Sequence, residues 1–190
     1  MNRSPSNPFW RYSLRAWRIP GVEEACLALQ ERCGADVNLL LFCGWTGRQG
    51  QPLDRRALRL AINRVGAWQS DVIAPLRQAR QGLKRQREGA AAALPAQGLR
   101  KRLAALELDL ERVEQALLAD LRTQWAAAPV AKPPREVIAT SLACYLGLLA
   151  KPPGRQELLC MARIAEACAP RSKHAVGVGL DLDDRVHADH

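Results

Sequence analysis

Apolar side chains recur every three or four residues along most of this chain, and proline or glycine separates the stretches in which they recur. One such stretch contains Leu58, Ile62, Val65, Trp68 and Val72. This period places apolar side chains along one face of an α-helix, whereas the alternating pattern typical of strands is nearly absent. The sequence therefore predicts an all-α fold.

The breaks in this pattern predict how the helices follow one another. We expect about seven helices in a single domain over residues 1–170, since a chain of 190 residues has the usual size of one domain. Pro75 is expected to kink or interrupt the helix that begins near residue 54. Residues 171–190 are expected to form a disordered tail.

The longest regular pattern lies near the middle of the chain. Leucine and valine alternate steps of four and three residues over 99–117, which is the heptad spacing of a coiled-coil seam. The preceding helix is its natural partner, so we expect a protruding antiparallel hairpin over about residues 76–127. A heptad seam serves a dimer equally well, which leaves the oligomeric state open. The hairpin would bring Arg77, Arg80 and Lys84 near Glu107, Asp109, Glu111 and Glu114.

Two other helices stand out by their apolar residues. Asn-Pro at 7–8 is typical of a helix start, and Trp10, Leu14 and Trp17 then share one face. Residues 39–43, Leu-Leu-Leu-Phe-Cys, form the most apolar run of the chain. Because a helix that is apolar on all sides must be surrounded by others, we expect this one at the centre of the core.

Composition and cysteine spacing argue against several classes of protein. No apolar stretch reaches the roughly 18 residues of a membrane-spanning helix, and the N-terminus does not resemble a secretory signal. We therefore expect a cytoplasmic protein that does not associate with membranes. The six cysteines include no Cys-x-x-Cys pair, which favours buried structural thiols. All three histidines lie in the expected tail, so we predict neither a metal site nor a cofactor.

The usual catalytic patterns are missing from the sequence as well. A nucleophilic cysteine or serine would need a partner histidine, and no histidine precedes the tail. The glycines at 44–50 are not followed by the Lys-Ser/Thr of a phosphate-binding loop. We therefore assign no catalytic residue and favour a role other than catalysis.

A ligand site is conceivable at the start of the apolar helix. Asp36 and Asn38 stand at its mouth and could orient a polar ligand, with Trp17 and Trp45 as aromatic walls. The simpler interpretation is structural, because Asp is a preferred helix cap and Asn satisfies nearby backbone groups. We favour the structural interpretation and keep the ligand site as an alternative.

Positive charge is concentrated in one part of the chain. Residues 48–102 hold thirteen Lys and Arg against three acidic residues, so this part accounts for the whole net charge of +9. A ridge on one helical face could follow nucleic-acid phosphates. No aromatic residues for base stacking lie among these cations, which argues against such a role. The ridge consists of Arg77, Arg80, Lys84 and Arg87.

The N-terminal part of the chain resembles a known family. The segments PFWRYSL, PGVEEACLALQ and GADVNLLLFCGW occur in this order over residues 8–45. They are similar to the start of a proteobacterial family of small proteins that is described only as a domain of unknown function. The resemblance implies a helical cytoplasmic protein and carries over no catalytic residue.

Three functions remain after these exclusions. The favoured hypothesis is a protein-interaction or regulatory module that presents the 76–127 hairpin to a protein partner. The first alternative is a nucleic-acid- or ribosome-associated protein that uses the basic region. The second alternative is a small-ligand-binding domain, or an enzyme, with a pocket near Asp36 and Asn38.

Overall fold

The ends of several helices are fixed by local hydrogen bonds and backbone conformation. Asn7 Oδ1 accepts a hydrogen bond from the N–H of Phe9 at 2.9 Å, and Asp36 Oδ1 accepts one from the N–H of Asn38 at 2.7 Å. Gly34 has φ of 70°, a left-handed conformation that favours glycine and closes a helix. These positions are the starts and stops that the sequence predicts.

The computed structural model describes residues 7–89, 96–125, 129–150 and 153–170. Within these ranges the chain forms α-helices and no strand, which confirms the all-α prediction. The π-helical turn η1 joins α4 to α5 without a break. In chain order the elements are α1 (Pro8–Trp17), α2 (Val22–Cys33), α3 (Val37–Arg48), α4 (Arg55–Trp68), η1 (Gln69–Ile73), α5 (Ala74–Gly89), α6 (Ala96–Thr123), α7 (Pro134–Leu146) and α8 (Arg155–Cys168).

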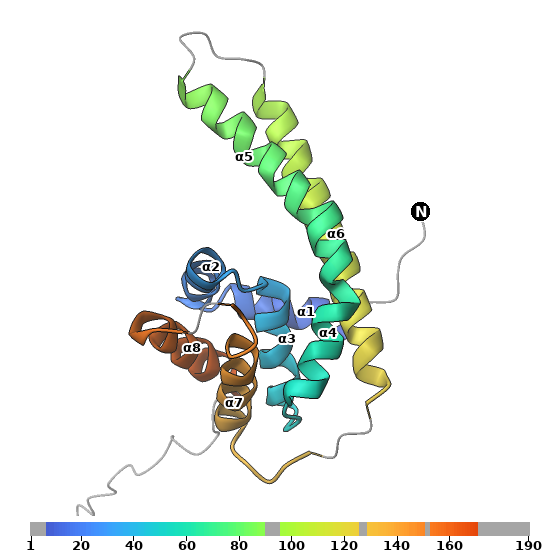
Figure 1. The fold of residues 1–190 in the computed structure, drawn as a ribbon, viewed down its shortest axis with the longest axis vertical. Helices are drawn as coiled ribbons and strands as arrows, with labels where there is room; N and C mark the ends of the chain where they lie inside the picture. The colour runs from blue at the N-terminus through green and yellow to red at the C-terminus, as the bar shows by residue number, and fades with distance from the viewer. Residues whose placement is uncertain (1–6, 90–95, 126–128, 151–152, 171–190) are drawn as a thin grey trace, which may run out of the picture.

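The helices form a body and a projection (Figure 1). In the body, α3 packs against α7 and α8 and also contacts α1 and α6, while α2 packs against α8. The pair formed by α5 and α6 protrudes, which confirms the predicted antiparallel hairpin. The expected turn of the hairpin and the expected tail at 171–190 lie mostly or wholly outside the described residues.

The core is built around α3, as its composition predicts. Leu40, Phe42 and Cys43 are fully buried, and Phe42 packs against Trp125 with ring centroids 6.0 Å apart. Farther along α3, a Cβ added at Gly47 would lie within 3 Å of α7. The close approach of α3 and α7 therefore depends on the missing side chain of this glycine.

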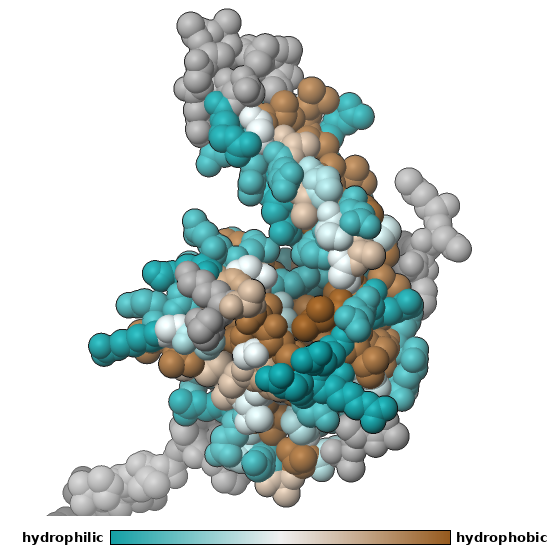
Figure 2. All heavy atoms as spheres, in the orientation of Figure 1, coloured by the Kyte–Doolittle hydropathy of each residue, from teal (hydrophilic) through white to brown (hydrophobic). Residues whose placement is uncertain are grey.

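The packing of α6 differs from the prediction. Leu99, Leu106 and Val113 are exposed, with 49% of Leu106 accessible, whereas the other seam residues, Leu103, Leu110 and Leu117, are half-buried, so the expected burial of the heptad seam holds for only part of it. We call Leu99, Leu106 and Val113 the α6 stripe, and Figure 2 shows apolar atoms along the edge of the hairpin. The side that α6 turns to the rest of the protein is instead mainly polar, and its buried members are Glu107, Glu114, Gln115 and Leu118.

The first helix also buries a face other than its most apolar one. Phe9, Tyr12 and Ala16 enter the core, whereas Leu14 is 41% exposed and Trp17 is half-buried. Residues at positions 9, 12 and 16 share a face that is rotated from the line formed by 10, 14 and 17. The aromatic line of α1 is therefore left at the edge of the core, where it borders a pocket.

Pro75 does not end the helix in which it lies. The turn before it widens into η1, in which the N–H of Ala74 bonds to the carbonyl of Gln69, five residues earlier. Proline has no N–H to offer the preceding turn, and a π-helical turn accommodates this with one extra residue. The expected kink or interruption at Pro75 thus takes the form of a π-helical turn before it, and the helical path continues through Pro75.

The described cysteines behave as packing residues. Cys26, Cys43 and Cys168 are buried, and none of these three forms a disulfide. Burial raises the pKa of the Cys26 and Cys43 thiols, which keeps them protonated and unreactive. Among the described residues, no helix combines the length and the hydropathy that crossing a bilayer requires.

Candidate functional site

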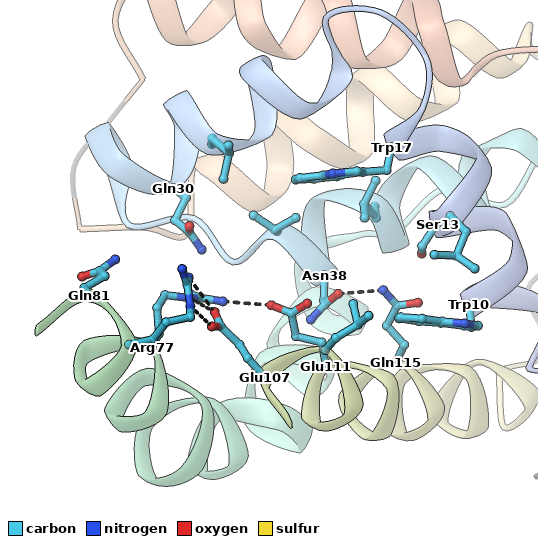
Figure 3. A pocket seen from close by; sticks show the side chains of 16 residues that line it. Trp10, Ser13, Trp17, Gln30, Asn38, Arg77, Gln81, Glu107, Glu111 and Gln115 are labelled. Atoms are coloured by element: carbon cyan, nitrogen blue, oxygen red, sulfur yellow. Dashed lines mark hydrogen bonds and ion pairs between the residues drawn. The ribbon is translucent and has the colours of Figure 1, made fainter. Parts of the chain in front are cut away.

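A pocket of about 350 Å³ lies between the body and the hairpin (Figure 3). Helices α1, α2 and α3 form one side of it, and α5 and α6 form the other. Its volume is within the range of small-molecule sites, about 300–1,000 Å³. The apolar part of the lining consists of Trp10, Leu14, Trp17, Leu27, Val37, Leu41 and Leu108.

The polar end of the pocket is held by ion pairs between the two helices of the hairpin. Arg77 Nε donates to Glu107 at 2.7 Å and its Nη2 donates to Glu111 at 3.0 Å. Arg80 Nε donates to the other oxygen of Glu107 at 2.6 Å. Burial alone would raise the pKa of Glu107, but the hydrogen bonds from Arg80 and Arg77 bring it below its usual value. Glu107 is therefore ionised and joins both arginines.

Behind this end lies a buried pair of carboxyl groups, Asp36 and Glu114. Glu114 is 0% exposed, and burial and the neighbouring Asp36 raise the pKa of Glu114 to about 10. Glu114 is thus a neutral acid at pH 7, and the neighbouring Asp36 contributes to this. Its Oε1 has no hydrogen-bond partner among the described residues. The hydroxyl of Tyr145 accepts from the backbone N–H of Asp36 at 2.7 Å and fixes the pair to α7.

Two amide side chains connect the carboxyl pair to the pocket. Asn38 Nδ2 donates to Glu114 Oε2 at 2.8 Å, and Gln115 Nε2 donates to Asn38 Oδ1 at 2.7 Å. All three side chains are buried, and Asn38 and Gln115 also line the pocket. Figure 3 shows Gln115 beside Asn38 at the floor of the pocket. We call Asn38 and Gln115 the amide pair.

Two residues that line the pocket each have a buried polar atom that lacks a hydrogen-bond partner in the described part of the chain. The atoms are Ser13 Oγ and Gln115 Oε1, and both side chains are more than nine-tenths buried. An unpaired buried polar group costs about 1–3 kcal/mol. Such atoms in a pocket wall are therefore suited to a bound molecule that supplies the missing hydrogen bonds.

The structure brings together some of the predicted ligand residues. Asn38 and Trp17 both line the pocket. Asp36 caps α3 and accepts from Gln69 Nε2 at 3.1 Å, so it lies behind the lining and orients it. Trp45 is elsewhere, because its ring stacks on Phe9 with centroids 5.1 Å apart.

The predicted basic ridge is only partly described. Arg77 and Arg80 line the pocket and are ion-paired with glutamates of α6, as the hairpin geometry predicts. Lys84 is exposed on α5, and the side chain of Arg87 lies outside the described residues. Asp109, expected to face these cations, instead pairs with Arg112 in its own helix at 3.3 Å.

Several pocket residues were not among the predicted ligand residues. Glu107, Glu111 and Gln115 were missed because the apolar positions of α6 were taken as its buried side. One signal was available, since Glu107, Glu111 and Glu114 are spaced four and three residues apart and so share one helical face. Within the described ranges, no group of three His, Cys, Asp or Glu side chains is placed to hold a metal ion.

Comparison with known proteins places the chain in a family. The family model described as "Protein of unknown function (DUF2390)" matches residues 8–118, which is more than half of the chain. The chain belongs to this family. The match extends well beyond the N-terminal segments that suggested it and includes every helix that lines the pocket. No curated protein and no solved structure matches the chain.

Proposed function

We propose that this protein binds a small, partly apolar molecule in the pocket between its body and its hairpin. The observation that carries this proposal is the pair of unpartnered atoms, Ser13 Oγ and Gln115 Oε1, in residues that line an open pocket. A fold that leaves two such atoms unpaired gains stability when a ligand pairs them. An apolar side chain at either position would avoid the free-energy cost of an unpaired buried polar atom.

The composition of the lining supports the same function. Trp10, Leu14 and Trp17 offer an apolar wall. Figure 3 shows Ser13 and Gln115 at the Trp10 end of the pocket and the ion-paired Arg77 and Glu107 at the opposite end. Small-molecule sites combine these two features, because the apolar wall supplies affinity and the few polar groups supply orientation. The pocket thus has the composition of a binding site for a molecule with an apolar body and a polar head.

The test is a thermal-shift screen of a metabolite library with three forms of the full chain. Leu27→Trp introduces a larger side chain at a half-exposed position of the pocket wall. Leu60→Trp makes the same change at a similarly exposed position of α4, outside this pocket. A ligand at 100 times its Kd adds about 2.7 kcal/mol of stability, so binders will be visible as a raised Tm.

We expect at least one compound to raise the Tm of the wild type and of Leu60→Trp but not of Leu27→Trp. A screen in which no compound shifts the wild type contradicts the proposal. The same holds if each active compound shifts all three forms equally, because binding would then occur outside the pocket.

A second candidate function is self-association through the α6 stripe. The α6 stripe is the exposed part of the heptad seam, and a second copy of the chain is a suitable partner for it. Arg102 and Asp109 flank the stripe on the same side, one heptad apart. Two copies of α6 packed antiparallel around Leu106 would set Arg102 of each copy opposite Asp109 of the other. This arrangement makes the partner of the hairpin another molecule of the same protein.

The remaining hypotheses gain nothing from the described contacts. Arg77 and Arg80 are neutralised by Glu107 and Glu111, so a nucleic-acid or ribosome-associated role stays a prediction. A regulatory role and a cytoplasmic location likewise stay predictions.

A further inference from the structure

The hydrogen bonds behind the pocket form a chain in which each side chain determines the orientation of the next. This chain starts at the carboxylate of Asp36. Its carboxylate accepts from the N–H groups of Asn38 and Leu39 and from Gln69 Nε2. Glu114 is held between this acceptor and Asn38, and its Oε2 accepts from Asn38 Nδ2. Because the NH₂ group of Asn38 is committed to Glu114, its carbonyl oxygen must face the other way.

The orientation of the Gln115 side-chain amide follows in the same way. Asn38 Oδ1 is an acceptor, so Gln115 turns its NH₂ group toward it at 2.7 Å. The carbonyl oxygen of Gln115 is then the atom left over, and it is the unpaired one. The carboxyl pair thus determines, through two amides, that the pocket floor presents a hydrogen-bond acceptor.

The charged groups of the pocket add to this preference. The arginines that line it, Arg77 and Arg80, already donate to Glu107 and Glu111. Arg112 lies over the ring of Trp10, 4.7 Å from its centroid, and is paired with Asp109. The two glutamates balance Arg77 and Arg80. An incoming anion would therefore meet acceptors and compete for cations that are already paired.

We propose, on the basis of the pocket function above, that the ligand is an organic amine with an apolar or aromatic body. Its N–H group donates to Gln115 Oε1, and its body lies against Trp10, Leu14 and Trp17. Aromatic faces also attract a cationic head, which adds to the selectivity for an amine over an acid of the same shape.

Matched probes test this class directly by isothermal titration calorimetry of the full chain. Tryptamine, indole-3-propionic acid and 3-methylindole share one body and differ in the head group, and all three are used with the ring nitrogen methylated so that only the amine head carries an N–H donor. We expect tryptamine to bind at least about ten-fold more tightly than the other two, the effect of one additional hydrogen bond to a buried group.

Two variants test whether Gln115 Oε1 is the acceptor and whether Glu114 determines its orientation. Gln115→Met removes the carbonyl oxygen at similar size, and we expect tryptamine to lose about ten-fold in affinity. Glu114→Gln lets both amides turn, because glutamine donates as well as accepts. In that variant we expect the ratio of tryptamine to indole-3-propionic acid affinities to fall toward one, with the fold intact by circular dichroism. Glu136→Gln, at an exposed position of α7, is the control and leaves the ratio unchanged.

The outcomes separate this inference from the proposed function. Tighter binding of indole-3-propionic acid than of tryptamine overturns the amine class and leaves ligand binding in place. If none of the probes binds while the library screen yields pocket ligands without an N–H donor, the class is again wrong and the pocket function stands. If neither probes nor library compounds bind, both proposals fail. An unchanged ratio in Glu114→Gln contradicts the role of the carboxyl pair.

Discussion

Helices α3 and α6 lie side by side in the structure and are built in opposite ways. α3 places leucine, phenylalanine and cysteine inside, and its buried residues contact α7, α8 and α1. α6 buries Glu107, Glu114 and Gln115 and leaves the α6 stripe exposed. Burying carboxyl and amide groups adds little to stability, and exposing leucines adds nothing to it. The difference indicates that α3 contributes more to the core, whereas most of α6 is available for the proposed pocket and the proposed interface.

The largest effect that tests this comparison is expected at the point where α6 does enter the core. Leu118 is fully buried, so Leu118→Ala should cost about 2–5 kcal/mol of unfolding free energy. Leu106→Ala, one of the exposed leucines, should change it by less than about 0.5 kcal/mol. Urea denaturation measures both. Similar losses in the two variants would show that the two sides of α6 do not differ.

The next effect concerns the close contact between α3 and α7. A Cβ at Gly47 would lie 2.6 Å from Ile138 Cγ1 and 2.9 Å from the Ile138 backbone, which cannot move without shifting α7. Gly47→Ala should therefore lower stability by about 1–3 kcal/mol. Gly66→Ala, in α4 with no atom within 4 Å of the added Cβ, should raise it by about 0.5–1 kcal/mol. Thermal unfolding of both variants checks the contrast, and a stable Gly47→Ala protein would refute the tight packing of α3.

A smaller effect is expected from the carboxyl pair, and it depends on pH. Glu114 keeps its proton in the folded state up to a pKa of about 10, whereas in the unfolded state it loses it near 4.5. Unfolding thus releases a proton between these values, so stability falls as pH rises. The loss is at most about 1.4 kcal/mol per pH unit for one group.

Glu114→Gln removes this dependence. We expect the variant to gain stability relative to the wild type as the pH rises from 5 to 8.5, because only the wild type loses stability through the titration of Glu114. Urea denaturation at several pH values provides the measurement. Parallel stability curves for the two proteins would show that Glu114 titrates normally and is not held as a neutral acid.

The smallest effect on stability is expected at the α6 stripe, where the readout is association. Leu106→Lys places a charge at the centre of the proposed antiparallel contact and should leave the unfolding free energy within about 0.5 kcal/mol. Sedimentation should show a concentration-dependent dimer for the wild type and for the control Leu60→Lys, and a monomer for Leu106→Lys. A wild type that stays monomeric at high concentration rules out self-association.

Much of the fold follows from local signals in the sequence. Asn7 and Asp36 start their helices, and the apolar run at 39–43 lies at the centre of the core, because caps and periodicity are properties of neighbouring residues. The pairing of Arg77 and Arg80 with Glu107 also followed from the hairpin and the charges alone. These features need no knowledge of distant parts of the chain.

The site depends on contacts that periodicity does not reveal. Asn38 and Glu114 are 76 residues apart, and their contact determines which side of α6 is buried. Sequence reasoning places leucines inside and carboxylates outside, which holds for most helices and reverses for α6. Trp17 and Asn38 were identified as candidates, but the glutamates of α6 were expected only as partners of the α5 cations, and Gln115 was not singled out.

The widened turn before Pro75 has a consequence for how the hairpin can vary. One surplus residue in η1 changes the phase of the helix by roughly 100°, so it sets the rotation of α5 about its axis relative to α4. Arg77 and Arg80 point at Glu107 only with that phase. Removing a single residue from Gln69–Ile73 would turn both guanidinium groups away from α6 while α4 kept its place. The length of η1 thus determines whether the arginines of α5 face the glutamates of α6.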